Sequence, residues 1–121
     1  MMMPAVELAR AIATGALSAR EAVQARMARI EATDGRVNAF TGKTYQRALR
    51  EADAVDALRA SGAALPPLAG VPYAVKNLFD VQGEVTLAGS KVNRGHAPAK
   101  ADMIRPLVAT AWRFAQEAGA R

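Results

Sequence analysis

The sequence predicts an α/β chain in which helices come first and a strand follows. Apolar residues recur every three or four positions through roughly the first 60 residues, which is the period of helices that bury one face. From residue 68 onward the apolar residues alternate with other residues instead, as they do in a strand. Prolines and a glycine between residues 61 and 67 separate the two patterns.

The first predicted helix covers residues 4–13. Pro4 suits the first helical position, because the N–H that proline lacks would have no partner there, and Gly15 suits a helix end. The segment is therefore a short helix with one apolar face, whose expected members are Val6, Ala9, Ile12 and Ala13.

The second predicted helix starts at a capping box, since Ser18 and Glu21 stand three residues apart. In such a box the serine side chain accepts the glutamate N–H, and the glutamate side chain accepts the serine N–H. The apolar residues that follow at helical spacing are Ala19, Ala22, Val23, Met27 and Ile30.

The third predicted helix runs from Lys43 to Ala60, with Gly62 just past its end. Its outer face is charged, so one stripe is left for burial. In all three helices the apolar side chains are read as ordinary core. The stripe of the third helix consists of Tyr45, Ala48, Leu49, Ala52, Val55 and Leu58.

A strand is predicted over residues 71–76. Val71, Tyr73 and Val75 alternate with the residues between them, and Pro72 suits the start of a strand or a sheet edge. Glycines then punctuate a polar loop that continues to residue 98. A last helix is predicted over residues 107–118, although a proline at position 106 interrupts the segment that begins at a possible N-cap, Asp102.

The composition excludes several kinds of site. No cysteine is present, which removes disulfides, thiolate nucleophiles and cysteine-bound zinc. His96 is the one histidine, so a histidine triad or a site with several histidine ligands cannot form within the chain. No phosphate-binding glycine loop occurs either. We expect no metal ion and no cofactor.

The charge pattern bears on partners and location. Sixteen basic residues against eleven acidic ones give a net charge of +5. The arginines are spread through the predicted helices between acidic residues, which favours solvated helix faces over a nucleic-acid surface. No apolar run approaches the roughly 20 residues that span a bilayer. We therefore expect a cytoplasmic chain with no membrane or nucleic-acid partner.

One motif carries chemistry. Residues 68–90 read Leu-Ala-Gly-Val-Pro-Tyr-Ala-Val-Lys-Asn-Leu-Phe-Asp-Val, then Gln-Gly-Glu-Val, then Thr-Leu-Ala-Gly-Ser, and this stretch resembles the lysine motif of the amidase signature family. The resemblance extends to residues 15–21, 29–31 and 37–40. It implies that Lys76 matches the lysine of a Ser, cis-Ser, Lys triad that cleaves carboxamides through an acyl-enzyme.

The resemblance also implies a fold and a domain organisation. The α/β fold would have N-terminal helices followed by the first strand and the active-site loop of a mixed sheet, a sheet that is incomplete in this chain. Residues 1–121 would form a single N-terminal part of an amidase domain. Residues 1–62 would be helical, residues 63–100 would hold the strand and the active-site loop, and residues 101–121 would be helical.

The chemistry of a lysine in this position fits the resemblance. At the end of an apolar strand Lys76 would lose water, and burial disfavours the ammonium ion, so a neutral amine could take a proton from a serine. The alternative is that Lys76 ends a strand at the surface or pairs with Asp80. Composition alone favours this alternative, and the flanking motif favours the base.

Within the family, residues 77–80 and 86–91 look most like the amidases of cyanuric acid breakdown, the 1-carboxybiuret hydrolases. Many relatives carry aspartate where this chain has Asn77. This resemblance implies a small urea-like amide as the substrate, and the alternative inside the family is the A subunit of tRNA-dependent amidotransferases. The structural alternatives are a turn with a packed aromatic ring for Asn77, Phe79 and Asp80, and loop hydrogen bonds for Thr86 and Ser90.

The serine-rich signature of the family lies beyond the lysine motif and is absent from these 121 residues. Residues 103–108 also look inserted relative to the family. We therefore expect an N-terminal fragment of an amidase that hydrolyses nothing alone. A small accessory subunit is implied by the same resemblance, and copies of the chain are expected to associate through residues 71–76. The alternative from another class is a non-catalytic helical interaction module.

Overall fold

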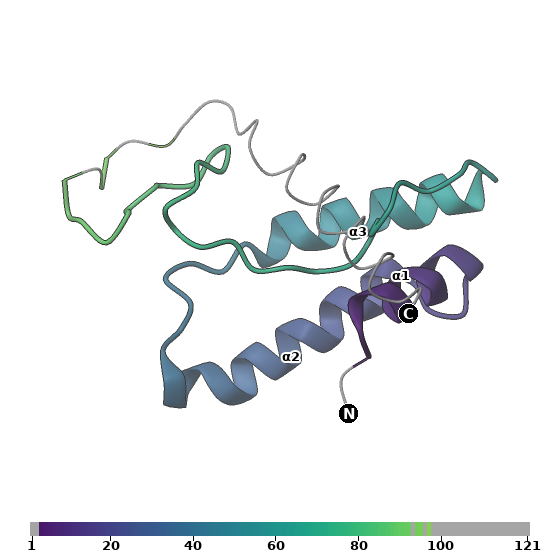
Figure 1. Cartoon of the computed structure of the whole chain (residues 1–121), viewed down its shortest axis with the longest axis horizontal. Helices are drawn as coiled ribbons and strands as arrows, with labels where there is room; N and C mark the ends of the chain where they lie inside the picture. Colours follow the sequence, from purple (N-terminus) through teal and green to yellow (C-terminus); the bar gives the residue numbers. More distant parts are fainter. Residues whose placement is uncertain (1–2, 93, 96, 98–121) are drawn as a thin grey trace, which may run out of the picture. The chain divides into compact units, whose positions relative to one another are not determined.

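The computed structural model describes residues 3–92, 94, 95 and 97. It contains three helices, α1 (Ala5–Thr14), α2 (Ala19–Val37) and α3 (Tyr45–Ala60), shown in Figure 1. The chain divides into two compact units, Met1–Pro72 and Tyr73–Arg121. The helix predicted over residues 107–118, the whole of residues 101–121 and His96 lie outside the described residues.

Helix α1 ends and α2 begins as the sequence predicts. Pro4 is the N-cap of α1 rather than its first residue, and Gly15 closes α1 in the left-handed conformation at φ 78°. Ser18 and Glu21 form the predicted capping box, in which the Glu21 N–H donates to Ser18 Oγ at 3.1 Å and the Ser18 N–H donates to Glu21 Oε2 at 2.9 Å. These bonds to Ser18 lower the pKa of the Glu21 carboxyl.

Helix α3 contributes a second cap to α2. The two carboxylate oxygens of Asp56 accept the N–H groups of Ala19 and Arg20 at 2.9 and 3.1 Å. Because Ser18 accepts the next two N–H groups, none of the first four donors of α2 lacks a partner. The Arg20 guanidinium also pairs with Asp53 at 2.6 Å. The end of α3 is thereby held against the start of α2, so the two helices run antiparallel (Figure 1).

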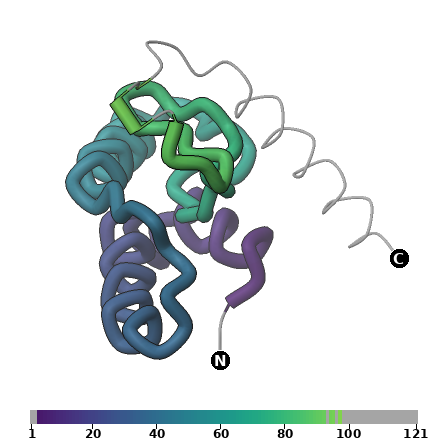
Figure 2. The backbone as a smooth tube through the Cα atoms, turned by 90° about the vertical axis from the view of Figure 1, so that its left-hand side faces the viewer, coloured from purple at the N-terminus to yellow at the C-terminus, as the bar shows by residue number. Residues whose placement is uncertain are grey.

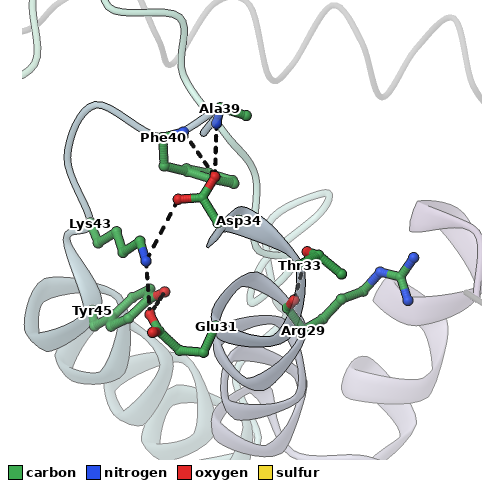
Figure 3. A network of polar contacts seen from close by, with 8 residues as sticks. All are labelled: Arg29, Glu31, Thr33, Asp34, Ala39, Phe40, Lys43 and Tyr45. Carbon is green, nitrogen blue, oxygen red and sulfur yellow. Dashed lines mark hydrogen bonds and ion pairs between the residues drawn. The ribbon is translucent and has the colours of Figure 1, made fainter. Parts of the chain in front are cut away.

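A polar network fixes the connection between α2 and α3 (Figure 3). Asp34 is buried, and its Oδ1 accepts the N–H groups of the two residues that follow the left-handed Asn38, at 2.8 and 3.3 Å. Glu31 Oε1 accepts the ammonium of Lys43 at 3.0 Å and the hydroxyl of Tyr45 at 2.7 Å. Hydrogen bonds therefore join the helix pair at both of its ends.

The core of this unit is small and rich in alanine. Ile12 is fully buried, and Met27, Leu49 and Val55 pack around the buried group. Two details of the predicted stripes are wrong: Ala13 is exposed, and Leu58 is 40% exposed. Leu8, one turn before Ile12, is buried although it was not among the predicted members of the stripe. The buried apolar residues are Leu8, Ala9, Ile12, Ala19, Ala22, Val23 and Ala52.

The segment after α3 returns to the core through two tight turns, along the backbone path in Figure 2. The N–H of Ala69 donates to the Pro66 carbonyl and the N–H of Val71 to the Leu68 carbonyl, at 3.1 and 3.0 Å. A side chain on Gly70 would meet the Ala19 methyl at 2.7 Å, and Gly70 has a φ of 78°. Glycine is therefore needed here both for its conformation and for its lack of volume.

The predicted strand does not form within the described residues. Residues 71–76 have no regular secondary structure, and Tyr73 is 62% exposed. A strand is defined by pairing with a neighbour, and the described part of the chain offers none. The alternation in residues 71–76 therefore does not predict a formed strand in the described residues.

Candidate functional site

The predicted catalytic residue, Lys76, lies in the second unit at the start of a closed loop. Its side chain is exposed, so the expected desolvation is absent from the described structure. Among the described residues no ion pair joins Lys76 to Asp80 either, so of the two structural alternatives the surface position is the one observed. The Lys76 carbonyl accepts the N–H groups of Leu78 and Phe79 at 2.8 and 3.1 Å, which turns the chain immediately after the lysine.

Asn77 closes the loop that follows. Its side-chain Oδ1 accepts the N–H of Leu87 at 2.9 Å, and its main-chain carbonyl accepts the N–H of Ala88 at 2.8 Å. Two consecutive N–H groups ten and eleven residues away are therefore held by one residue. We call residues 76–90 the lysine loop, and its neck is this pair of bonds at Asn77.

The other polar residues of the motif make loop hydrogen bonds. Thr86 Oγ1 donates to Asp80 Oδ1 at 2.7 Å, and Ser90 Oγ accepts the N–H of Val92 at 3.2 Å. Phe79 is half-buried. The structure thus shows the turn at Asn77 and the loop bonds of Thr86 and Ser90 that the sequence left open as structural alternatives.

The end of the lysine loop is a tight turn. The N–H of Ser90 donates to the Leu87 carbonyl at 2.8 Å, and Ala88 and Gly89 between them have φ values of 48° and 74°. Two consecutive positive φ values across such a bond are the pattern of a type I′ turn. Sequence reasoning missed Leu87 and Ala88 as partners of Asn77; the Ala-Gly pair signals a turn, but nothing in it indicates which residue the turn binds.

The described residues of this unit supply a base candidate and no assembled nucleophile. A primary amine accepts a proton when it is neutral, but the hydroxyls of Thr86 and Ser90 are engaged in the loop bonds above. Across the residues that the structure describes, no three histidine, cysteine or acidic side chains gather as metal ligands. No described helix combines the length and the apolarity needed to cross a bilayer.

Two kinds of known protein are similar to this chain in sequence. The chain is 57% identical to AtzE, a 1-carboxybiuret hydrolase subunit of Pseudomonas sp. (strain ADP), over 84% of this chain and 22% of that protein. It is 45% identical to the A subunit of the glutamyl-tRNA(Gln) amidotransferase of Streptomyces coelicolor, over 79% of this chain and 19% of that one. The chain therefore spans about a fifth of the length of these relatives.

A solved structure agrees with these sequence relatives. It belongs to a vestigial protein complex connected with the origins of an s-triazine catabolic enzyme, and its chain superimposes with a TM-score of 0.81 at 55% identity, covering 88% of this chain and 24% of that one. The sequence profile of the amidase family matches residues 21–110, a range that includes Lys76 and the whole lysine loop. The resemblance to amidases is thereby confirmed, and this chain belongs to the amidase family.

Proposed function

We propose that this chain provides the lysine-bearing N-terminal part of an amidase that hydrolyses a carbon–nitrogen bond of a small, urea-like amide. The observation that carries the proposal is the 57% identity to a 1-carboxybiuret hydrolase subunit, together with the family match across Lys76. In the complete amidase that we propose, residues 71–76 form the first strand of a mixed sheet, and the lysine loop follows that strand. The proposal requires no metal ion and no cofactor.

In this proposal Lys76 is the general base. Its neutral amine takes a proton, through the cis-serine, from a nucleophilic serine whose oxygen then attacks the amide carbonyl. The nitrogen leaves as an amine after it gains the proton, and water hydrolyses the acyl-serine. Both serines belong to a part of the family's sequence that follows the lysine motif, so we expect the 121 residues alone to turn over no amide.

A chimera tests the role of Lys76. The matched N-terminal residues of the Pseudomonas protein are replaced by those of this chain, and hydrolysis of biuret-like amides is measured. We expect activity in the chimera and a loss of at least about 1,000-fold in Lys76→Met, because removing one member of a catalytic unit removes most of its effect. Lys91→Met is the matched control, since Lys91 is an exposed lysine shortly after the loop.

Equal activity of Lys76→Met and the parent chimera would contradict the proposal. Activity of the 121 residues alone, lost in Lys76→Ala, would contradict the expectation that the serines lie elsewhere. Inactivity of this folded chimera and of a matching chimera with the Streptomyces amidotransferase subunit, both with intact Lys76, would favour a non-catalytic helical interaction module.

The second candidate is the A subunit of a tRNA-dependent amidotransferase, which the 45% identity to the Streptomyces protein supports. A chimera with that protein distinguishes the two: activity there, with none in the hydrolase chimera, would favour the amidotransferase.

We also propose a cytoplasmic location and, as partner, a small accessory subunit. The absence of cysteine from the sequence is compatible with a reducing cytoplasm. The partner is supported by the solved relative, whose chain comes from a protein complex. Association between copies of this chain remains a further proposal, supported by the exposed apolar residues Tyr73, Val75 and Leu78.

A further inference from the structure

The described structure holds Lys76 by its backbone and not by its side chain. The side chain is exposed and forms no ion pair among the described residues. Its carbonyl, in contrast, accepts two N–H groups, from Leu78 and Phe79. The direction of the Lys76 Cα–Cβ bond, from which the amine extends, is therefore set by whatever fixes the backbone around residues 76 and 77.

Asn77 is the residue best placed to fix that backbone. It accepts the Leu87 N–H through its side chain at 2.9 Å and the Ala88 N–H through its carbonyl at 2.8 Å. The two bonds act on neighbouring donors and leave from both the side chain and the main chain of one residue. Such a pair restrains rotation of the Asn77 peptide more than either bond alone.

We propose that Asn77 is a positioning residue for Lys76. It acts through its side-chain oxygen, which accepts the Leu87 N–H. This inference rests on the proposed function, in which Lys76 is the base. The oxygen is the feature that asparagine shares with aspartate, because either side chain can present an acceptor at the same distance from the backbone.

The lysine loop contains its own control. The bond from Thr86 to Asp80, at 2.7 Å, also crosses the loop, but it lies inside the ring that the Asn77 bonds close. Both of its partners are at least three residues from Lys76 along the chain. Its loss should loosen the interior of the loop while the neck stays closed.

The experiment is NMR on the full 121-residue chain and four variants. Solvent exchange of the Leu87 N–H reports the bond, and residual dipolar couplings of the Lys76 and Asn77 N–H vectors report the backbone direction. We expect Asn77→Leu, which keeps the shape and removes the acceptor, to accelerate Leu87 exchange roughly tenfold and to change both couplings. Asn77→Asp should keep wild-type values, and Thr86→Val should leave the two couplings unchanged.

The fourth variant removes the same bond from the donor side, by an ester in place of the Leu87 amide. The ester should reproduce the coupling changes of Asn77→Leu. If Asn77→Leu does not fold, as judged by the amide protection of Val23 in α2, the ester alone tests whether the bond orients Lys76. The proposal would be overturned if the Lys76 coupling were unchanged in Asn77→Leu or in the Leu87 ester. Failure of Asn77→Asp to retain the wild-type couplings, or equal changes in Thr86→Val, would also overturn it. None of these measurements depends on hydrolysis, so they stand apart from the chimera assay.

Discussion

Residues 3–72 are stabilised by one kind of contact, and the lysine loop is stabilised by another. The helical unit has a buried core centred on Ile12 and carboxylate bonds at both ends of its helix pair. The lysine loop is held by tight turns and by the two bonds at Asn77, while its Leu78 side chain is 45% exposed. Packing therefore determines the stability of the first region, and hydrogen-bond geometry determines the shape of the second.

This difference shows where substitutions should act. A buried side chain contributes free energy through the area that it removes from water, whereas an exposed loop residue contributes little in this way. Stability measurements should thus respond to the helical unit and barely to the loop.

The largest effect is expected for Ile12→Ala. Ile12 has no exposed surface, and its loss should leave a cavity in a core that otherwise consists largely of alanine. We expect the free energy of unfolding to fall by about 3 to 5 kcal/mol, measured by urea denaturation with circular dichroism. Leu78→Ala in the lysine loop is the comparison and should change it by less than about 0.5 kcal/mol. Equal effects of the two substitutions would refute the contrast.

The second effect concerns Gly70 and has an internal control. Gly70→Ala must place a methyl group 2.7 Å from the Ala19 methyl while keeping a φ of 78°. Gly62 has nearly the same φ, 79°, but nothing lies within 4 Å of the position a methyl would take. We expect a cost of about 2 to 3 kcal/mol for Gly70→Ala and about 1 kcal/mol for Gly62→Ala, by the same denaturation.

The difference between the two alanine variants isolates the steric part of the cost, because the conformational part is common to both. A larger loss for Gly62→Ala than for Gly70→Ala would mean that the segment after α3 does not pack on Ile12 and Ala19 as described.

A smaller effect is expected at the capping box. Ser18→Ala removes the acceptor of the Glu21 N–H and should lower the free energy of unfolding by about 1 kcal/mol. Ser61→Ala is the matched control, because the Ser61 hydroxyl donates to the Leu58 carbonyl at the exposed end of α3. An unchanged denaturation midpoint for Ser18→Ala, with cooperative unfolding, would count against the cap.

Sequence reasoning predicted the parts of the fold that depend on neighbours along the chain. The capping box, the three helical stripes and the helix end at Gly15 need only residues within a few positions of one another. Asp56 as a cap of α2 was not predictable, since it lies 37 residues from Ala19 and is brought there by the antiparallel packing of α2 and α3.

The family of the chain was predictable from the motif around Lys76, whereas the surroundings of that lysine were not. The motif selected Lys76, and the comparisons confirm the family to which that motif belongs. The strand over residues 71–76 and the desolvated lysine were not found, because each depends on atoms that surround the segment and not on the segment itself. The partners of Asn77 were missed for the same reason: a side-chain acceptor in a turn does not indicate which N–H it will bind.

The smallest expected effect is a pH dependence from the network between α2 and α3. The hydrogen bond from Tyr45, followed by that from Lys43, lowers the pKa of Glu31. The bond to Glu31 raises the pKa of Lys43, and desolvation, followed by the bond to Glu31, raises the pKa of Tyr45. The folded chain thus favours an ionised Glu31, a protonated Lys43 and a neutral Tyr45.

Each pKa shift determines how the free energy of unfolding changes on the acid or the alkaline side of the pH range. The contribution of Glu31 is complete above its unfolded-state pKa of about 4.5 and is lost as the pH falls through the lower folded value. Those of Lys43 and Tyr45 are complete below unfolded values of 10.5 and 10.0 and are lost as the pH rises through the higher folded values. Stability from this network should therefore be flat between about pH 5 and pH 9.

Glu31→Gln tests this profile, because glutamine keeps an acceptor and cannot ionise. The wild-type chain should lose more stability than Glu31→Gln between pH 5 and roughly pH 3, measured by thermal melts at low salt. All three groups are near the surface, so 1 M salt should shrink the difference. Parallel profiles for the two chains at low salt would show that Glu31 titrates alike in the folded and unfolded states, and that the network joins α2 to α3 without favouring one protonation state.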